Sequence, residues 1–272
     1  MDLLGLGKVT DNGLKIMKMV YPDLAQPGVQ KVGQALGTVL DLGNTILLPL
    51  KLANANANVF FQHHMDNYRK KMEAIPEENV GVVQPTIGLK ILDELFTVTN
   101  EDIAELFLNL LVNASTVERA KYAHPGFIDV IKNLSSDEAK IFNEFYMNNQ
   151  YVLFTELVVI NFGSSIYYDV ISSNIVDHVE LDFPENSNFY LNNLSRCGLI
   201  AKFFKFFKEE IGEFESLDER LLSEVKRAEE QLAASNMETA RVELHKGKYE
   251  ITPFGEIFKE SITLTEKLEL SI

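Results

Sequence analysis

The chain has 272 residues, of which 46% are hydrophobic and 24% charged, and its 25 Lys and Arg against 40 Asp and Glu give a formal net charge of −15. This composition is too apolar for a disordered chain and too mixed for a polytopic membrane protein. The acidic balance argues against general nucleic-acid binding, which depends on lysine and arginine neutralising phosphates. The single cysteine, Cys197, excludes a disulfide framework and a cysteine-based zinc site.

The charge is unevenly distributed along the sequence. Residues 1–75 contain eight basic and six acidic residues, a net charge of +2, so residues 76–272 carry −17. Charge asymmetry of this kind is typical of chains whose parts meet different surroundings. Solvated helix faces would account for most of the acids, and the alternative is an acidic body attached to a near-neutral apolar arm.

Residues 1–28 are predicted to be a tail and linker. They begin with MDLLGLGKVTDNG, which has no basic n-region and no long apolar run, so no secretory signal is expected. The following YPDLAQPG (21–28) contains two prolines and a glycine, which favour a linker.

Residues 29–75, named here the N-terminal arm, carry a long helical pattern that Pro76 ends. Gln34, Thr38, Asp41 and Thr45 share one helical face, so the pattern predicts an amphipathic helix and not a membrane-spanning one. A straight helix over residues 30–74 would be about 67 Å long, which exceeds the diameter of about 50 Å of a compact chain of this size. Pro49 is the expected bend.

The opposite face of the arm is a candidate partner or membrane surface. Its apolar stripe and its small residues comprise Gly33, Leu36, Gly37, Val39, Leu40, Gly43, Ile46, Leu47 and Leu50. Three interpretations remain open at this point: packing against residues 86–148 in the core, self-association, and contact with a membrane surface.

Residues 76–134 are expected to form a central helical region. The patterns predict helices at about 86–97, 101–113 and 126–133, and Thr99 or Asn100 precedes acidic first-turn residues in the second of them. Ser135 and Glu138 fit a capping box that starts a helix over 136–148.

Residues 135–272 are predicted to form a winged-helix-like module. QYVLFTELVVI (150–160) suits a strand or a buried helix, a helix over 185–197 ends at Gly198, and residues 217–234 form a charged helix. ARVELHKGKYEIT (240–252) predicts a β-hairpin with its turn at Lys246-Gly247, and Thr252-Pro253 starts a last helix through Ile262.

The winged helix-turn-helix resemblance rests on YLNNLSRCGLI (190–200) and YEITPFGEIF (249–258). The helix that would read DNA, residues 184–196, has one base, Arg196, and an acid, Glu185, which favours protein interaction over DNA reading.

No constellation of residues indicates chemistry. His63, His64 and Asp66 are the only compact set of metal-ligand types, and two ligands at i, i+3 do not make a metal site. The sequence has no phosphate-binding lysine loop, nucleophile elbow or kinase signature. We therefore expect no catalytic residue, no cofactor and no metal, and no small-molecule substrate is identified.

Several segments resemble the Abi-alpha family of bacterial proteins. They are residues 32–80, which include ILLPLKLANA, then TNEDIAELFLNLLVNAS (99–115), AHPGFIDVIKNLSSDEAKIF (123–142) and YLNNLSRCGLI (190–200). The resemblance implies a bacterial, cytoplasmic protein linked by name to abortive infection, a defence against phage, and it supplies no active site.

Together these observations predict a mainly helical α+β protein with a long kinked amphipathic N-terminal helix, a central helical bundle and a C-terminal winged-helix-like module. The expected function is non-enzymatic phage defence through contact with a protein partner or a second copy, or through a membrane surface reached by residues 30–70. The alternative is a DNA-associated transcriptional regulator that uses the winged helix. The expected location is the cytoplasm, with membrane association open.

Overall fold

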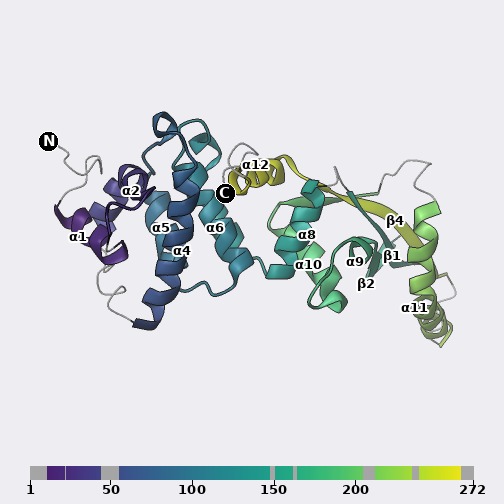
Figure 1. Cartoon of the computed structure of the whole chain (residues 1–272). Coiled ribbons are helices and arrows are strands. Elements are labelled where there is room, and N and C mark those ends of the chain that lie inside the picture. The colour runs from purple at the N-terminus through teal and green to yellow at the C-terminus, as the bar shows by residue number, and fades with distance from the viewer. Residues whose placement is uncertain are drawn as a thin grey trace. The chain divides into compact units, whose positions relative to one another are not determined.

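The computed structural model describes residues 11–21, 23–43, 55–147, 151–161, 164–204, 212–234 and 239–264. The chain forms two compact units: unit 1 comprises residues 1–133 and 257–272, and unit 2 comprises residues 134–256. The prediction of a mainly helical α+β protein is confirmed (Figure 1). Along the chain, unit 1 gives way to unit 2 between residues 133 and 134, and the described residues 257–264 group with unit 1.

Unit 1 is a bundle of helices. Its elements are α1 (Asp11–Val20), α2 (Val29–Gly43), α4 (Ala55–Glu73), η1 (Glu77–Asn79), α5 (Pro85–Leu95), α6 (Glu101–Ala114), η2 (Ala120–Tyr122), α7 (Gly126–Lys132) and the end of α12 (Pro253–Ile262). Helix α2 packs on α1, α4 and α5, while α6 packs on α4, α5 and α7. Each helix turns its apolar face inward, so Leu36, Tyr68 and Phe107 are buried.

The N-terminal arm folds back on itself within unit 1. The Nζ of Lys31, near the start of α2, donates to the carbonyls of Glu73 (2.6 Å) and Ile75 (2.5 Å) at the end of α4. Gly28, with φ of +82°, lies against α4, where a Cβ would come 2.7 Å from the carbonyl oxygen of Arg69. The arm is therefore two packed helices and not one straight rod, and the expected bend at Pro49 lies outside the described residues.

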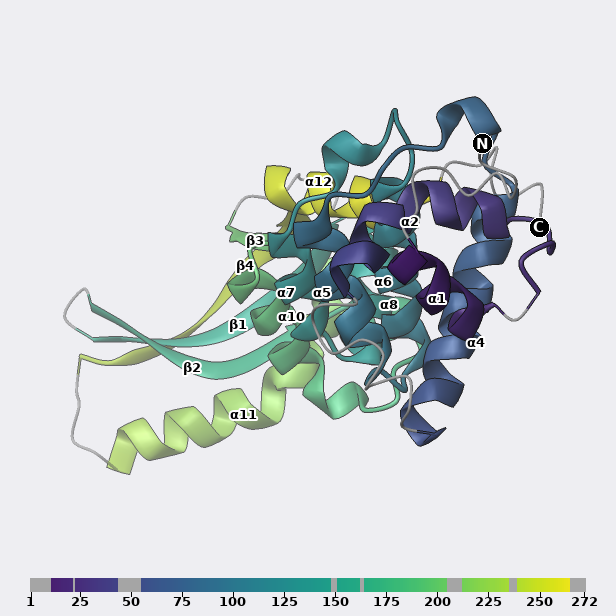
Figure 2. The same cartoon turned by 90° about the vertical axis from the view of Figure 1, so that its left-hand side faces the viewer.

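Unit 2 combines an antiparallel sheet with helices. Its elements are α8 (Ser136–Met147), β1 (Tyr151–Asn161), β2 (Ser164–Ser173), α9 (Ile175–His178), η3 (Pro184–Asn186), α10 (Ser187–Arg196), β3 (Ile200–Phe203), α11 (Phe214–Ala234), β4 (Arg241–Ile251) and the first residues of α12. The strand order is β2-β1-β4-β3. Helix α11 packs along β1, β2 and β4 (Figure 2), and α10 packs on α8, β2 and β3.

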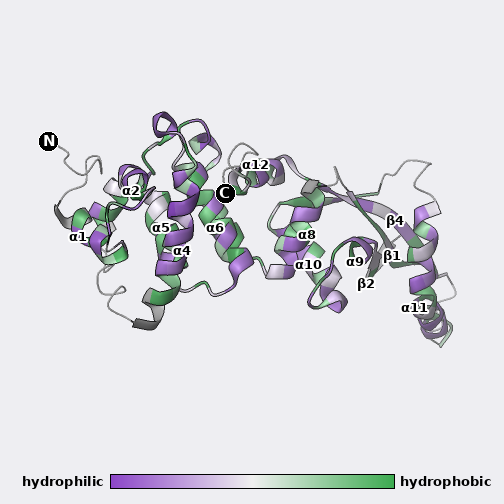
Figure 3. Ribbon diagram, in the orientation of Figure 1, coloured by the Kyte–Doolittle hydropathy of each residue, from purple (hydrophilic) through white to green (hydrophobic). Residues whose placement is uncertain are grey.

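The register of the sheet explains how α11 is held. Leu153 of β1 pairs with Lys248 of β4, so both side chains point to the same face. Leu153 forms a buried cluster with Phe214 and Leu217 of α11. Figure 3 shows hydrophilic and hydrophobic residues alternating along α11, as expected for a helix with one face on a sheet.

The predicted hairpin over residues 240–252 is wrong, because β4 runs as one strand from Arg241 to Ile251 and pairs with β1 through Lys246 and Gly247. Gly247 serves close packing and not a turn: a Cβ there would lie 2.5 Å from the carbonyl oxygen of Phe203 and 2.7 Å from Cζ of Phe154. The hairpin of this unit is instead β1 with β2, a strand that the sequence patterns missed.

Three predicted helix ends are confirmed: the starts of α8 and α12 and the end of α10. The backbone N–H of Ser135 donates to Glu138 Oε2 (2.6 Å) and that of Glu138 to Ser135 Oγ (3.3 Å), which is a capping box. The Thr252 hydroxyl caps α12 by accepting from the N–H of Gly255 (2.9 Å). Gly198, with φ of +77°, ends α10, as expected for a left-handed C′ residue.

Candidate functional site

The apolar stripe of the arm is covered by its own chain over the part that the structure describes. Gly33, Leu36, Gly37, Val39 and Leu40 are buried in unit 1. Val39 packs so closely on Gly88 of α5 that a Cβ there would lie 2.6 Å from Val39 Cγ2. Gly43 is the last residue of α2, and Ile46, Leu47 and Leu50 lie outside the described residues. Use of this stripe by a partner would require α2 to separate from its neighbours.

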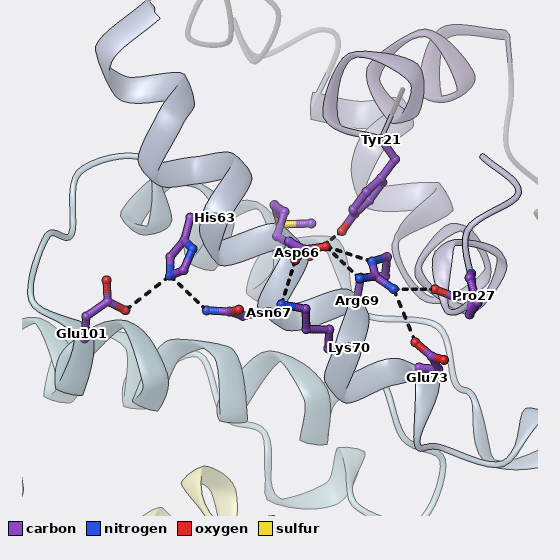
Figure 4. Close-up of polar contacts among 10 residues, drawn as sticks. Tyr21, Pro27, His63, Asp66, Asn67, Arg69, Lys70, Glu73 and Glu101 are labelled. Atoms are coloured by element: carbon purple, nitrogen blue, oxygen red, sulfur yellow. Dashed lines mark hydrogen bonds and ion pairs between the residues drawn. The ribbon is translucent and has the colours of Figure 1, made fainter. Parts of the chain in front are cut away.

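His63 points away from Asp66 (Figure 4), and the buried His64 lies with its Nε2 3.1 Å from the carbonyl oxygen of Val98. Asp66 accepts hydrogen bonds from Arg69 Nε (3.0 Å) and Nη2 (2.9 Å) and pairs with Lys70 (3.0 Å). Burial raises the pKa of Asp66, but the hydrogen bonds and charges of Lys70 and Arg69 outweigh it, so the pKa lies below its usual range. His63 instead contacts Asn67 (3.2 Å) and lies 3.8 Å from Glu101.

Arg69 and its neighbours hold the linker before α2. Arg69 Nη1 donates to the Pro27 carbonyl (2.8 Å) and to Glu73 (3.3 Å), and the Tyr21 hydroxyl donates to the Met65 carbonyl (2.6 Å) (Figure 4). Burial raises the pKa of Tyr21 well above its usual value. This network fixes structure and does not form a metal site. The described part of the chain contains no group of three or more His, Cys, Asp or Glu placed to hold a metal ion.

A polar clasp in unit 1 holds the end of α12. The buried amide of Asn113 donates to the carbonyls of Ser261 (2.8 Å) and Thr263 (3.0 Å), and its oxygen accepts from Arg119 Nε (2.8 Å). Arg119 also pairs with Glu260 (3.0 Å). The clasp satisfies carbonyls that the end of a helix leaves without partners. We call these residues the Asn113 clasp. Sequence patterns missed it, because its halves are far apart in the chain.

In unit 2, two buried carboxylates at the start of α8 position α10 and the segment before it. Asp137 accepts from the backbone N–H groups of Asp182 (2.8 Å) and Phe183 (3.0 Å), and Glu138 accepts from Asn193 Nδ2 (2.6 Å). Burial raises the pKa of Asp137, but the hydrogen bonds that its carboxylate accepts from Asp182 and Phe183 together have the larger, opposite effect. The pKa of Asp137 therefore lies below its usual range.

The helix that Asp137 and Glu138 position turns a distinct face to solvent. We call this the α10 face, and it comprises Glu185, Phe189, Asn192 and Arg196, all of which are exposed. Phe189 is 67% exposed, and Phe183, just before η3, is 57% exposed. Exposed aromatic residues with polar neighbours are typical of protein-interaction surfaces. The sequence identified this helix, but the exposure of Phe189 depends on packing against α8.

The strand lysines of unit 2 are neutralised inside the unit. The pairs are Lys202 with Glu156 (2.6 Å), Lys246 with Asp218 (2.7 Å) and Lys248 with Glu250 (2.8 Å). Three arginines are also close to acids: Arg220 to Asp177 (2.8 Å), Arg227 to Glu224 (3.7 Å) and Arg241 to Glu243 (2.6 Å). Residues 134–256 hold 11 Lys and Arg against 22 Asp and Glu. This arrangement offers few cations to a phosphate backbone.

One hollow lies between α11 and the sheet, with a volume of about 240 Å³. Leu157, Val170 and Ala228 form its apolar part, and Glu224, Arg227 and Gln231 its polar part. This volume is below the usual range of ligand pockets.

With an α+β fold, a helical bundle and an exposed helix face established, the comparisons with known proteins give the family. A family model described as abortive infection alpha matches residues 60–262, and the chain belongs to this family. The resemblance expected from the sequence is confirmed, and the family description links the chain to abortive infection.

The other comparisons add little. A solved structure of an uncharacterized protein from the hydrocarbon-degrading marine bacterium Alcanivorax borkumensis SK2 has 17% identity and a TM-score of 0.39, covering 54% of this chain and 98% of that chain. No curated protein matches the chain. None of the described helices has the length and apolar character needed to cross a membrane.

Proposed function

We propose that this protein acts in abortive infection in the bacterial cytoplasm through protein–protein contacts made by the α10 face, without catalytic chemistry of its own. The observation that carries the proposal is the exposed ring of Phe189 on α10. Hydrogen bonds to the buried carboxylates of Asp137 and Glu138 hold this helix and the segment before it in place. A rigid aromatic anchor loses little conformational entropy when it binds, so it suits recognition of another protein.

The charged residues on and near the α10 face favour a protein over nucleic acid as the binding partner. The α10 face has one base, Arg196, and one acid, Glu185, and Lys202 on the neighbouring strand β3 is already paired with Glu156. A winged-helix module that read DNA would need unpaired cations near its recognition helix. Self-assembly or membrane contact through residues 30–70 is a less favoured route, because α2 would first have to leave α1, α4 and α5.

Phage plating tests the proposal. Cells that produce Phe189→Glu should lose protection, with plaque numbers rising about tenfold or more, because a charge replaces an interface anchor. Since Phe189 is exposed, the variant should keep its fold and abundance. The matched control is Leu222→Glu on α11, where the wild-type side chain is 62% exposed in the same unit. Protection by Phe189→Glu equal to that of the control would refute the proposal.

Measuring the binding of the purified chain to duplex DNA distinguishes the proposed function from the alternative, a DNA-associated transcriptional regulator. We expect weak binding at 50 mM salt and no sequence preference, because the unit is acidic. Tight, salt-sensitive and sequence-specific binding would instead favour the transcriptional regulator.

A further inference from the structure

The residues of the α10 face have a symmetric order along the helix. Glu185, Phe189, Asn192 and Arg196 are spaced by four, three and four positions along the chain, and the three that belong to α10, Phe189, Asn192 and Arg196, lie within about 60° of one another around the helix axis. Glu185 lies in the 3-10 turn η3, and Asn186, with φ of −90° and ψ of 5°, joins this turn to α10, which begins at Ser187. The acid therefore lies at one end of the face, the base at the other, and Phe189 and Asn192 lie between them.

This order is self-complementary under a two-fold axis. The midpoint between Glu185 and Arg196 coincides with the midpoint between Phe189 and Asn192, because both fall between Tyr190 and Leu191. If two copies of the helix meet antiparallel at this point, Glu185 of each lies opposite Arg196 of the other, and Phe189 lies opposite Asn192. An interface of this kind, in which each copy uses the same surface, is the usual form of a homodimer.

The charges at the two ends are placed to make these contacts. Arg196 donates through Nε (3.0 Å) and Nη2 (2.7 Å) to Asn193 Oδ1, which fixes the guanidinium at the end of the face and leaves Nη1 available. Glu185 forms no hydrogen bond or ion pair with any residue that the structure describes, so its carboxylate is also available. By contrast, most of the other described cations of unit 2 already pair with acids of the same unit.

We infer that the partner of the α10 face is a second copy of this chain, bound with the two α10 helices antiparallel and with Glu185 facing Arg196 across the interface. The inference rests on the proposed function and names its partner. One helix face and the neighbouring Phe183 bury less than the roughly 800 Å² per partner of a standard interface. The dimer should therefore be weak and form with rising protein concentration.

Sedimentation of the purified full chain with charge-reversal variants tests this pairing. Glu185→Arg and Arg196→Glu should each weaken the dimer by about tenfold, because like charges replace both ion pairs. An equimolar mixture of the two variants should form a heterodimer as tight as the wild type, and so should the double variant. Glu229→Arg, on the exposed side of α11, is the control for a change in net charge alone.

The outcomes separate this inference from the function on which it rests. A wild-type chain that stays monomeric at 200 µM, or a mixture no tighter than its single components, overturns the dimer. If Phe189→Glu still abolishes protection in that case, the α10 face binds a different protein and the proposed function stands. Far-UV circular dichroism confirms that each variant is folded, and Glu185→Arg alone suffices if Arg196→Glu disturbs the end of the helix.

Discussion

Replacing Asn113 with alanine should destabilise unit 1 by about 3 kcal/mol. The amide donates to the carbonyls of Ser261 and Thr263 and accepts from Arg119, and Asn113 has no exposed surface. Removing it leaves a buried carbonyl and one N–H of a guanidinium unsatisfied. Each unsatisfied group costs about 1–3 kcal/mol, whereas the gain in helix propensity at this position is below about 1 kcal/mol, so the loss dominates.

Urea denaturation followed by circular dichroism measures this change, since the chain has no tryptophan. A second readout is local: trypsin should cleave after Lys259 faster in the variant, because the end of α12 is released from the Asn113 clasp. Asn143→Ala, at an exposed position of α8, is the control and should change the stability by less than about 0.5 kcal/mol. Equal stabilities of the two variants would show that the clasp contributes nothing.

Replacing Gly255 with alanine should destabilise unit 2 by about 3 kcal/mol or more, although alanine favours helices by about 1 kcal/mol over glycine. A Cβ at Gly255 would lie only 2.1 Å from the carbonyl oxygen of Leu199. This oxygen belongs to the backbone that leads into β3, so no side-chain rotation can relieve the contact. The start of α12 would have to move away from the sheet.

Gly212→Ala is the matched control for this substitution. A Cβ at Gly212 meets no atom within 4 Å, so the change should be neutral or slightly stabilising. Thermal unfolding should show a lower Tm for Gly255→Ala and no decrease for Gly212→Ala. If the two variants melt together, the close approach of α12 to Leu199 is not a constraint in solution.

Local signals in the sequence predicted the ends of the helices well. The capping residues Asn100, Ser135 and Thr252 and the terminator Gly198 each act on groups within a few positions, so their residue types are sufficient. The long helical pattern of the arm was also correct over residues 29–43 and 55–73. Local patterns do not predict that α4 folds back and packs on α2.

The errors arose where tertiary contact decides the role of a residue. Lys246-Gly247 has the composition of a turn, but Gly247 is needed because Phe154 and Phe203 approach the strand closely. The glycine-containing stretch NFGSS (161–165) between two β-rich runs was an available signal for β1 and β2, and it was missed. The Asn113 clasp joins residues 148 positions apart, a pairing that no local pattern could indicate.

The α10 face combines features that follow from the local sequence with one that depends on tertiary contacts. Its helix and its single base are evident from residues 184–196, and the low charge favours a protein partner as a hypothesis. The exposure of Phe189 depends on which side of the helix packs on α8, and the buried acids Asp137 and Glu138 determine that side. Under the proposed function, the net charge of −15 matters less than the charges of Glu185 and Arg196 on this face.

Phage plating on cells that produce Glu185→Arg and Arg196→Glu, separately and together, tests the central claim most directly. We predict that each variant alone loses protection, as we also predict for Phe189→Glu, and that co-production of the two restores it, because their charges become complementary across the interface. Full protection by Phe189→Glu and by each charge variant alone would contradict the claim that the α10 face carries the function.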